Sequence, residues 1–476
     1  MYLPTLPPGC TPYPARTDLC PGTVGQGPNG IQRQFARERL LYVQQLILHH
    51  ATIMRIQSAL ALMSLVGATA CATTKVSFDA ANNTVINGKT IFPISLAVLP
   101  PVDGKTPNGG SAWQEFSKAG VNFARVAPGD YWDKHGWEPE GLHVARKYMD
   151  QLAKAKINVW LTLGDELSYV KPDDQEGQSK LKEMLKMFKD HPALGGWKGA
   201  DEPQWGNMNT KGKRPPESIA TAYKLVHEVD PNHPVLVLQA PRGTAADNAA
   251  YDAYLDITGM DVFPVGYPPG GHVPTWPNKQ ISMVGDWTKI IVEAAQGKPV
   301  WMTLQIAWSG VAKKGKTLRF PTFPQERFMT YEAIINGARG VNYFGGGHGV
   351  AQTLSERDRP LGYNWTFWER VLKPVLAEIN ETSPLHTALV AANSRLPVKA
   401  EGAAGVEFTV REVGEQIFIL ACKREGETAQ VTFSGLPTAV TGGDVLYESP
   451  RKVEVSKGQF TDWFGPEEVH VYRLGR

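Results

Sequence analysis

Residues 191–203 of the chain are His191-Pro192-Ala193-Leu194-Gly195-Gly196-Trp197-Lys198-Gly199-Ala200-Asp201-Glu202-Pro203. The run at 194–200 consists mostly of small and apolar residues without polar alternation, which predicts a buried strand. Pro203 ends this strand, because proline has no N–H for the hydrogen-bond ladder. Asp201 and Glu202 therefore stand at a strand's carboxyl end, where barrel enzymes build their sites. Asp-Glu-Pro also suits an ordinary loop or a helix N-terminus, but the strand context favours chemistry.

Seven further strand-like runs occur along the chain, and a helical pattern follows each of the eight. The predicted strands cover residues 91–99, 121–126, 157–163, 194–200, 234–239, 257–262, 299–305 and 340–344. The predicted helices cover residues 111–119, 141–154, 178–189, 217–229, 247–254, 282–295, 325–336 and 365–379. Eight strand–helix repeats predict an α/β fold, a parallel (β/α)8 TIM barrel, which we assign to residues 76–383.

The pattern changes after Pro384 to short β-rich segments that are separated by glycines and charged turns. These segments cover residues 406–410, 416–422, 429–433, 453–455 and 468–472. They predict a small antiparallel β-sandwich over residues 384–476. The segment holds no cluster of catalytic residues, so its expected role is to pack against the barrel.

Charge and cysteine content exclude several classes of protein. Lysine and arginine number 49 against 47 acidic residues, and the net charge of +2 gives no field that would favour nucleic acid or an anionic membrane. Cys10, Cys20, Cys71 and Cys422 show no CxxC or Cys/His spacing, so we expect no metal site and no cofactor. Cys422 lies in a β-rich run and is expected to be a buried thiol.

The first 72 residues predict an exported protein. Residues 54–72 combine a basic start, an apolar run at 59–66 and an Ala-x-Ala cleavage site, as in a signal peptide. Because such a signal belongs at a chain start, residues 1–53 are interpreted as a disordered extension or as sequence upstream of the true start at Met54. Cys71 also resembles a bacterial lipoprotein acylation site, although Ala68 stands where that motif prefers leucine. Periplasmic, extracellular and lipid-anchored locations all stay open, as does the oligomeric state.

In a parallel barrel the carboxyl ends of all strands meet at one face. The polar and aromatic residues expected there are Arg125, Asp165, Glu166, Asp201, Glu202, Gln239, Arg242, Asp261, Tyr267, Gln305, Trp308, Tyr343 and His348. Carboxylates and aromatic rings together favour glycoside hydrolysis, in which one carboxylic acid protonates the leaving oxygen and a second carboxylate acts as base or nucleophile. Neighbouring carboxylates also raise each other's proton affinity.

Residues 85–380 resemble the clan A (β/α)8 glycoside hydrolases, in which the fourth strand ends in Asn-Glu-Pro and its glutamate is the acid/base. The resemblance implies that Glu202 is the general acid, with Asp201 in the place of the asparagine. The clan's nucleophile is a glutamate at the end of strand seven, where this chain has Gln305. An amide cannot form the glycosyl ester, so Gln305 is a hydrogen-bonding residue of the cleft or a satisfied buried amide.

The second carboxylate is then Asp261 or Glu166, and retaining and inverting mechanisms both stay open. The alternative role for Asp261 is structural, with its side chain capping the backbone of the following loop as in an Asx turn. The resemblance further implies a carbohydrate substrate, bound by the polar side chains and stacked on the aromatic rings. The residues expected to bind it are Asp201, Arg125, Gln305, Trp308, Tyr343, Tyr267 and His348. Trp197 lies within its strand and is expected to pack in the core.

Two other functions remain open. A barrel that has lost the strand-seven glutamate is also suited to bind carbohydrate without cleaving it. A lyase that uses Tyr343 or His348 as base is the third alternative.

Overall fold

We analysed a computed structural model, which describes residues 73–128, 138–205, 212–266, 269–270, 272–306, 320–345 and 354–475. The chain divides into two compact units, Met1–Cys71 and Ala72–Arg476, and all described residues belong to the second. No helix among them is both long enough and apolar enough to cross a membrane. The predicted signal peptide, Cys71 and the 1–53 extension lie outside the described residues.

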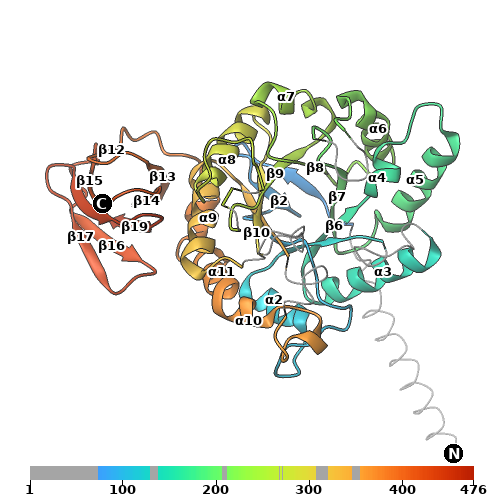
Figure 1. The fold of residues 1–476 in the computed structure, drawn as a ribbon, viewed down its shortest axis with the longest axis horizontal. Helices are drawn as coiled ribbons and strands as arrows, with labels where there is room; N and C mark the ends of the chain where they lie inside the picture. The colour runs from blue at the N-terminus through green and yellow to red at the C-terminus, as the bar shows by residue number, and fades with distance from the viewer. Residues whose placement is uncertain are drawn as a thin grey trace, which may run out of the picture. The chain divides into compact units, whose positions relative to one another are not determined.

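Eight parallel strands close into a barrel, as the repeats predict (Figure 1). The strands are β4 (Ile94–Leu96), β5 (Phe123–Val126), β6 (Asn158–Thr162), β7 (Leu194–Asp201), β8 (Val235–Gln239), β9 (Ile257–Val262), β10 (Trp301–Gln305) and β11 (Gly340–Phe344). They follow one another around the barrel in chain order, and β11 pairs with β4 to close it. Each predicted barrel strand overlaps one of these, so the predicted fold class is confirmed.

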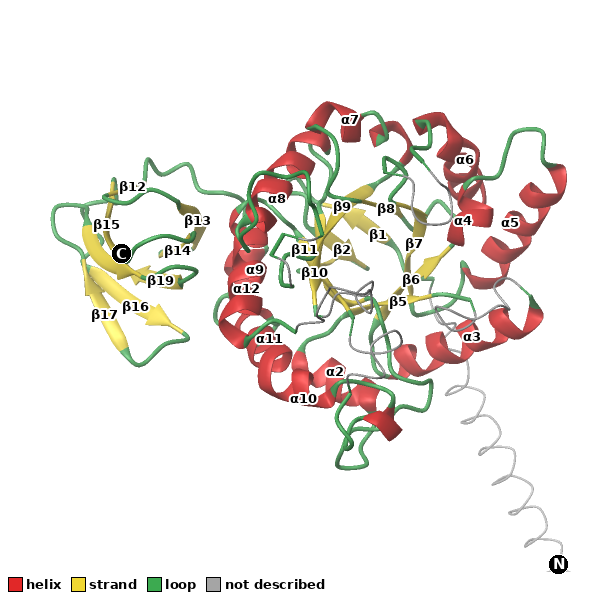
Figure 2. Cartoon of the chain, viewed as in Figure 1, coloured by secondary structure: helices red, strands yellow, loops and turns green. Residues whose placement is uncertain are grey.

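Helices surround the ring of strands (Figure 2). They are α2 (Ala112–Ala119), α3 (Pro139–Lys154), α4 (Gly164–Ser168), α5 (Gln175–Phe188), α6 (Ala220–Val229), α7 (Ala245–Ala249), α8 (Met283–Ala294), α9 (Phe323–Ile335), α10 (Trp365–Phe367), α11 (Lys373–Ile379) and α12 (His386–Leu389). In α5 the apolar residues Leu181, Leu185 and Phe188 recur at helical spacing and are fully buried. No predicted helix covers α4, a short helix that follows β6.

An apolar cluster fills the amino-terminal end of the barrel. Phe123, Trp160, Ile257 and Trp301 lie at or near the starts of their strands and belong to this cluster. A small antiparallel sheet precedes the barrel and packs on it through Phe78 and other side chains. Its strands are β1 (Val76–Phe78), β2 (Thr84–Ile86) and β3 (Lys89–Ile91). Apolar side chains from these strands therefore occupy this end of the barrel.

The C-terminal strands form the predicted β-sandwich. One sheet contains β13 (Val406–Val413), β14 (Gln416–Lys423), β19 (Val469–Gly475), β16 (Gly442–Leu446) and β17 (Arg451–Glu454), and the other contains β12 (Lys399–Glu401), β15 (Ala429–Ser434) and β18 (Phe460–Phe464). Cys422 is a fully buried free thiol, as expected. Arg327 of α9 pairs with Glu378 at 2.9 Å and donates to the Val469 carbonyl at 2.8 Å, which anchors the sandwich to the barrel.

Candidate active site

Charged residues from β5, β7 and β9 interact with one another at the carboxyl-terminal half of the barrel. Arg125 comes from β5, Lys198 and Asp201 from β7, and Asp261 from β9, while Glu202 directly follows β7. Neighbouring Trp197 faces the helices, where it is fully buried and donates from Nε1 to Asp230 at 2.8 Å. Side chains alternate along a strand, so Lys198 faces the barrel interior.

The Lys198 side chain is completely buried, and its ammonium group donates to the Asp201 carboxylate. It also donates to the Ala200 carbonyl at 3.3 Å. Burial lowers the pKa of Lys198 by disfavouring the charged form. For Asp201, burial raises the pKa, but the positive charges of Lys198 and Arg125 outweigh it and hold the pKa below its usual range. Asp201 is therefore an ionised carboxylate.

Glu202 lies at an irregular point of the barrel wall. The pairing of β7 with β8 shifts register between Lys198 and Asp201, and the Glu202 N–H donates to the Leu238 carbonyl at 2.8 Å. Glu202 has a φ of 49°, in the left-handed region that a residue with a side chain adopts at a cost. Strained backbone of this kind clusters at functional sites, where the surrounding structure imposes it.

The Glu202 carboxyl keeps its proton at neutral pH. Burial raises its pKa to about 9, with further contributions from the negative charges of Asp201 and Asp261. A carboxylic acid that holds a proton in a polar cleft can donate it to a substrate oxygen. Glu202 thus has the protonation state that the general acid needs.

Asp261 is the second titratable carboxyl of the cluster. Burial raises its pKa to about 7, and the charge of Asp201 adds to this shift, while a hydrogen bond with Thr303 opposes it. Its Oδ1 is buried without a hydrogen-bond partner among the described residues. Asp261 therefore ionises near neutral pH while Glu202 stays protonated, because their environments separate the two pKa values.

Arg125 lies in the cluster, as predicted. Its side chain is buried and donates from Nε to the Thr162 hydroxyl at 3.2 Å. Its positive charge lowers the pKa of both Asp201 and Asp261.

The structure does not bring Glu166 and Tyr343 to the cluster, and both expectations are corrected. Glu166 lies on α4 with 64% of its side chain exposed, 3.9 Å from the ammonium group of Lys180 on α5. Tyr343 is fully buried, with its hydroxyl 3.0 Å from that of Thr330 on α9. Successive strand residues point to opposite faces, and Tyr343 occupies the face toward the helices.

Gln305 is a satisfied buried amide, one of its two predicted roles. Its Oε1 accepts from the Val265 N–H at 2.8 Å, and its Nε2 donates to the Val265 carbonyl at 2.6 Å. The side chain is fully buried, so it fixes the segment after β9. Three other predicted site residues, Trp308, Tyr267 and His348, lie outside the described residues.

Several residues near Glu202 were not assigned roles from the sequence. Lys198 was noted only as part of a strand, although a lysine inside an apolar run is itself a signal of a buried charge. Trp205 is 41% exposed, three residues after Glu202, and the Arg242 guanidinium carbon lies 5.5 Å from its ring centroid. Thr303 was not considered, because its role depends on lying beside Asp261 in the β9–β10 pairing.

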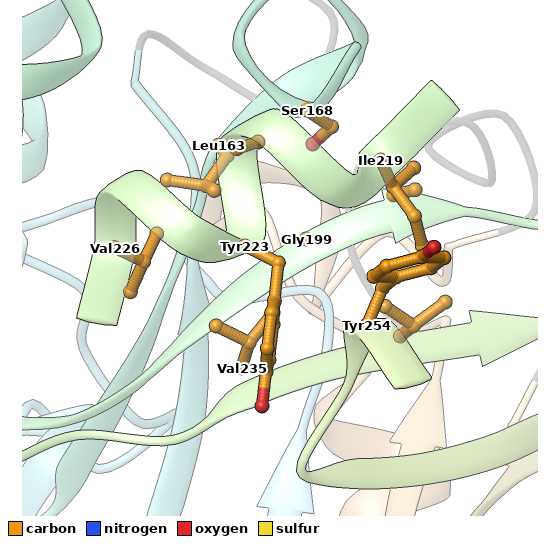
Figure 3. A pocket seen from close by; sticks show the side chains of 11 residues that line it. Leu163, Ser168, Gly199, Ile219, Tyr223, Val226, Val235 and Tyr254 are labelled. Carbon is orange, nitrogen blue, oxygen red and sulfur yellow. The ribbon is translucent and has the colours of Figure 1, made fainter. Parts of the chain in front are cut away.

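A small pocket lies elsewhere, between β7, β8 and helices α4 and α6 (Figure 3). Its lining is mostly apolar and includes Leu163, Val226 and Val235. Tyr223 also lines it, and its hydroxyl donates to Asp256 at 2.9 Å. The pocket lies between the strands and the helices and holds none of the clustered carboxylates, so it is not the candidate site.

No protein-family model matches the chain, and no curated protein matches it in sequence. A solved glycoside hydrolase family 5 structure from Bacteroides vulgatus is similar with a TM-score of 0.54 and 13% identity, covering 84% of this chain and 92% of that one. A second structure, described as a glycoside hydrolase, has a TM-score of 0.53 and 11% identity, covering 85% of this chain and 97% of that one. The resemblance to barrel glycoside hydrolases is therefore confirmed at the level of the fold.

Proposed function

We propose that the chain is an exported glycoside hydrolase that cleaves O-glycosidic bonds of a polysaccharide or oligosaccharide, with Glu202 as general acid. The observation that carries the proposal is the placement of two carboxyls, Glu202 after β7 and Asp261 on β9, around the Lys198–Asp201 ion pair. Burial raises the pKa of Glu202 to about 9 and that of Asp261 to about 7, which leaves one acid and one base near pH 8. Glycoside hydrolysis needs this combination of roles.

In the proposed reaction, Glu202 transfers its proton to the glycosidic oxygen as the bond to the anomeric carbon breaks. The ionised Asp261 supplies the second function. It either removes a proton from the attacking water or attacks the anomeric carbon and forms an ester that water then hydrolyses. Inversion or retention of the anomeric configuration in the first product distinguishes these two routes.

Asp201, Lys198 and Arg125 set the conditions for this chemistry. The two cations hold Asp201 ionised, and the charge of Asp201 then helps to keep the proton on Glu202. Asp201 also has the acceptor oxygens that suit hydrogen bonds from sugar hydroxyl groups.

A non-catalytic carbohydrate-binding barrel is the second candidate. It is favoured by Gln305, which stands where the clan has its nucleophile and is held by the Val265 backbone. A binder of this kind would take up glycans without releasing new reducing ends.

A panel of glycans, followed by measurement of reducing ends and of the product anomer, tests the two candidates. The hydrolase proposal expects product from at least one glycan, and loss of that product in Glu202→Gln. Binding by calorimetry with no product over days would contradict hydrolysis and support the binder.

Export and membrane attachment are proposed from residues 54–72 and Cys71. Mass spectrometry of the protein secreted by a bacterial host tests both. A mature chain that begins near residue 71 supports export, and an acylated Cys71 supports a lipid anchor. Peptides from residues 1–53 would contradict a translation start at Met54.

A further inference from the structure

An exposed aromatic ring and a fixed cation lie next to each other close to Glu202. The backbone N–H of Trp205 donates to the backbone carbonyl of Glu202 at 3.1 Å, so the position of Trp205 in the chain is tied to that of the acid. Its side chain remains 41% exposed, although large apolar side chains are mostly buried elsewhere. The Arg242 guanidinium carbon lies 5.5 Å from the centroid of the Trp205 ring. A ring in this position can stack on a sugar face.

Two backbone carbonyls hold the Arg242 guanidinium in place. One of its terminal nitrogens donates to the Pro241 carbonyl at 2.7 Å, and the other donates to the His272 carbonyl at 3.1 Å. A guanidinium has five N–H donors, so donors remain after these two bonds. A planar cation that is already fixed loses little freedom when it binds a carboxylate or a sulfate.

No carboxylate among the described residues forms an ion pair with Arg242. Burial lowers the pKa of Arg242, and the nearby Glu202 carboxyl raises that pKa when it is ionised. Glu202 carries a proton at neutral pH and so does not neutralise Arg242. Among the described residues, Arg242 is therefore a partly buried cation without an ionised carboxylate as its partner at neutral pH.

Charges of both signs surround the acid. Arg125 on β5, Lys198 on β7 and Arg242 after β8 are cations, and they face at most two ionised carboxylates, Asp201 and Asp261. The two carboxylates interact with Lys198 and Arg125, which leaves Arg242 as the cation without an ion-paired carboxylate among the described residues. A cation of this kind attracts anionic ligands.

We propose that Trp205 and Arg242 form a subsite for a sugar unit that carries an anionic group, either a carboxylate or a sulfate ester. The sugar ring stacks on Trp205, and the anionic group binds the remaining donors of Arg242. The assignment of this unit to the cleaved glycan rests on the proposed function. The subsite itself rests on the geometry of Trp205 and Arg242.

The test is an array of hexose, hexuronate and sulfated hexose oligosaccharides, probed with the full chain and followed by calorimetry on matched neutral and anionic ligands. The wild-type protein is expected to bind an anionic member at least about tenfold more tightly than its neutral counterpart.

Arg242→Gln removes this preference, and Trp205→Ala weakens binding of the same ligand. Arg370→Gln, an exposed arginine of the 368–372 helical turn, keeps the preference. Hexuronate binding alone assigns a carboxylate, and sulfated hexose binding alone assigns a sulfate ester.

Equal affinity for neutral and anionic ligands would overturn the subsite, as would a preference that survives Arg242→Gln or binding to no anionic member of the array. Thermal melting of each variant shows that it is folded. Failure of the subsite and failure of the proposed function give different results. Hydrolysis of neutral glycans without an anionic preference overturns only the subsite, whereas Arg242-dependent binding without hydrolysis overturns only the hydrolase.

Discussion

The ammonium group of Lys198 donates to the carboxylate of Asp201 within the barrel, and the Lys198 side chain is completely shielded from water. The carboxylate of this pair places a negative charge next to Glu202, where it opposes loss of the Glu202 proton. A single ion pair on β7 therefore contributes to the protonation state of the residue that follows the strand.

Asp201→Asn should lower the free energy of unfolding by about 3 kcal/mol or more, because it leaves the fully buried ammonium group of Lys198 without its carboxylate partner. Lys198→Met in the same background should recover part of the loss, since it removes the unpaired charge. Denaturant unfolding of the two single variants and the double variant measures the coupling. Strictly additive losses would show that the two side chains do not stabilise each other.

The pH dependence of kcat/KM should be bell-shaped. Activity rises as Asp261 ionises near pH 7 and falls as Glu202 loses its proton near pH 9, so the optimum lies between these values. The two carboxyls interact, so the acidic and basic limbs of the pH profile report apparent pKa values that belong to the pair. Asp261→Asn should abolish the acidic limb in any residual activity. An optimum near pH 5 would contradict the assignment of both roles.

Asp261 and Glu166 were alternatives for the second carboxylate, and of the two only Asp261 interacts with the charges around Glu202. Asp261→Asn should reduce kcat by about a hundredfold or more, because it removes the base or nucleophile. Glu166→Gln is the matched control and should stay within about twofold of wild type, since the exposed Glu166 interacts with Lys180 outside the cluster. Steady-state kinetics on the cleaved glycan measure both. The reverse order of effects would return the role to Glu166.

Glu202→Gln should stabilise the protein increasingly as pH rises. A carboxyl whose pKa is raised by folding, here from 4.5 to about 9, binds its proton more tightly in the folded chain. Its contribution to stability is thus intact below pH 4.5 and declines as pH rises toward 9. The neutral amide of the Glu202→Gln variant avoids this loss of stability. The Tm of the variant minus the Tm of wild type should therefore grow by about 2 °C or more between pH 4 and pH 8. A constant Tm difference over this range would show that Glu202 titrates normally.

The fold was accessible from the sequence because each barrel strand is a short buried run and each helix has its own periodicity. The eight predicted strands and helices recur at their positions, and the β-sandwich follows them. The sheet β1–β3 was missed, because its three-residue strands are too short for a periodic pattern and directly precede a barrel strand. The short helix α4 was not predicted for the same reason.

The site was accessible only in part. The position of Glu202 after a buried strand and that of Asp261 at the end of another placed both at the mouth of a barrel. Tyr343 was misplaced, because strand position alone does not say which face a side chain occupies. The contacts of Trp205 with Arg242 join segments that are distant in the chain. Pairings of that kind become visible only once the chain is folded.

The central claim is that Glu202 protonates the leaving oxygen, and leaving-group dependence tests it most directly. Once the cleaved glycan is known, kcat/KM of wild type and Glu202→Gln can be compared on that glycan and on the dinitrophenyl glycoside of the same sugar. The leaving oxygen of the glycan needs a proton, so we expect Glu202→Gln to lower kcat/KM on the glycan by about a hundredfold or more. The dinitrophenolate of the second substrate departs without a proton, so kcat/KM on that substrate should fall far less. Equal losses on the two substrates, or no loss on the glycan, would contradict the role of Glu202 as general acid.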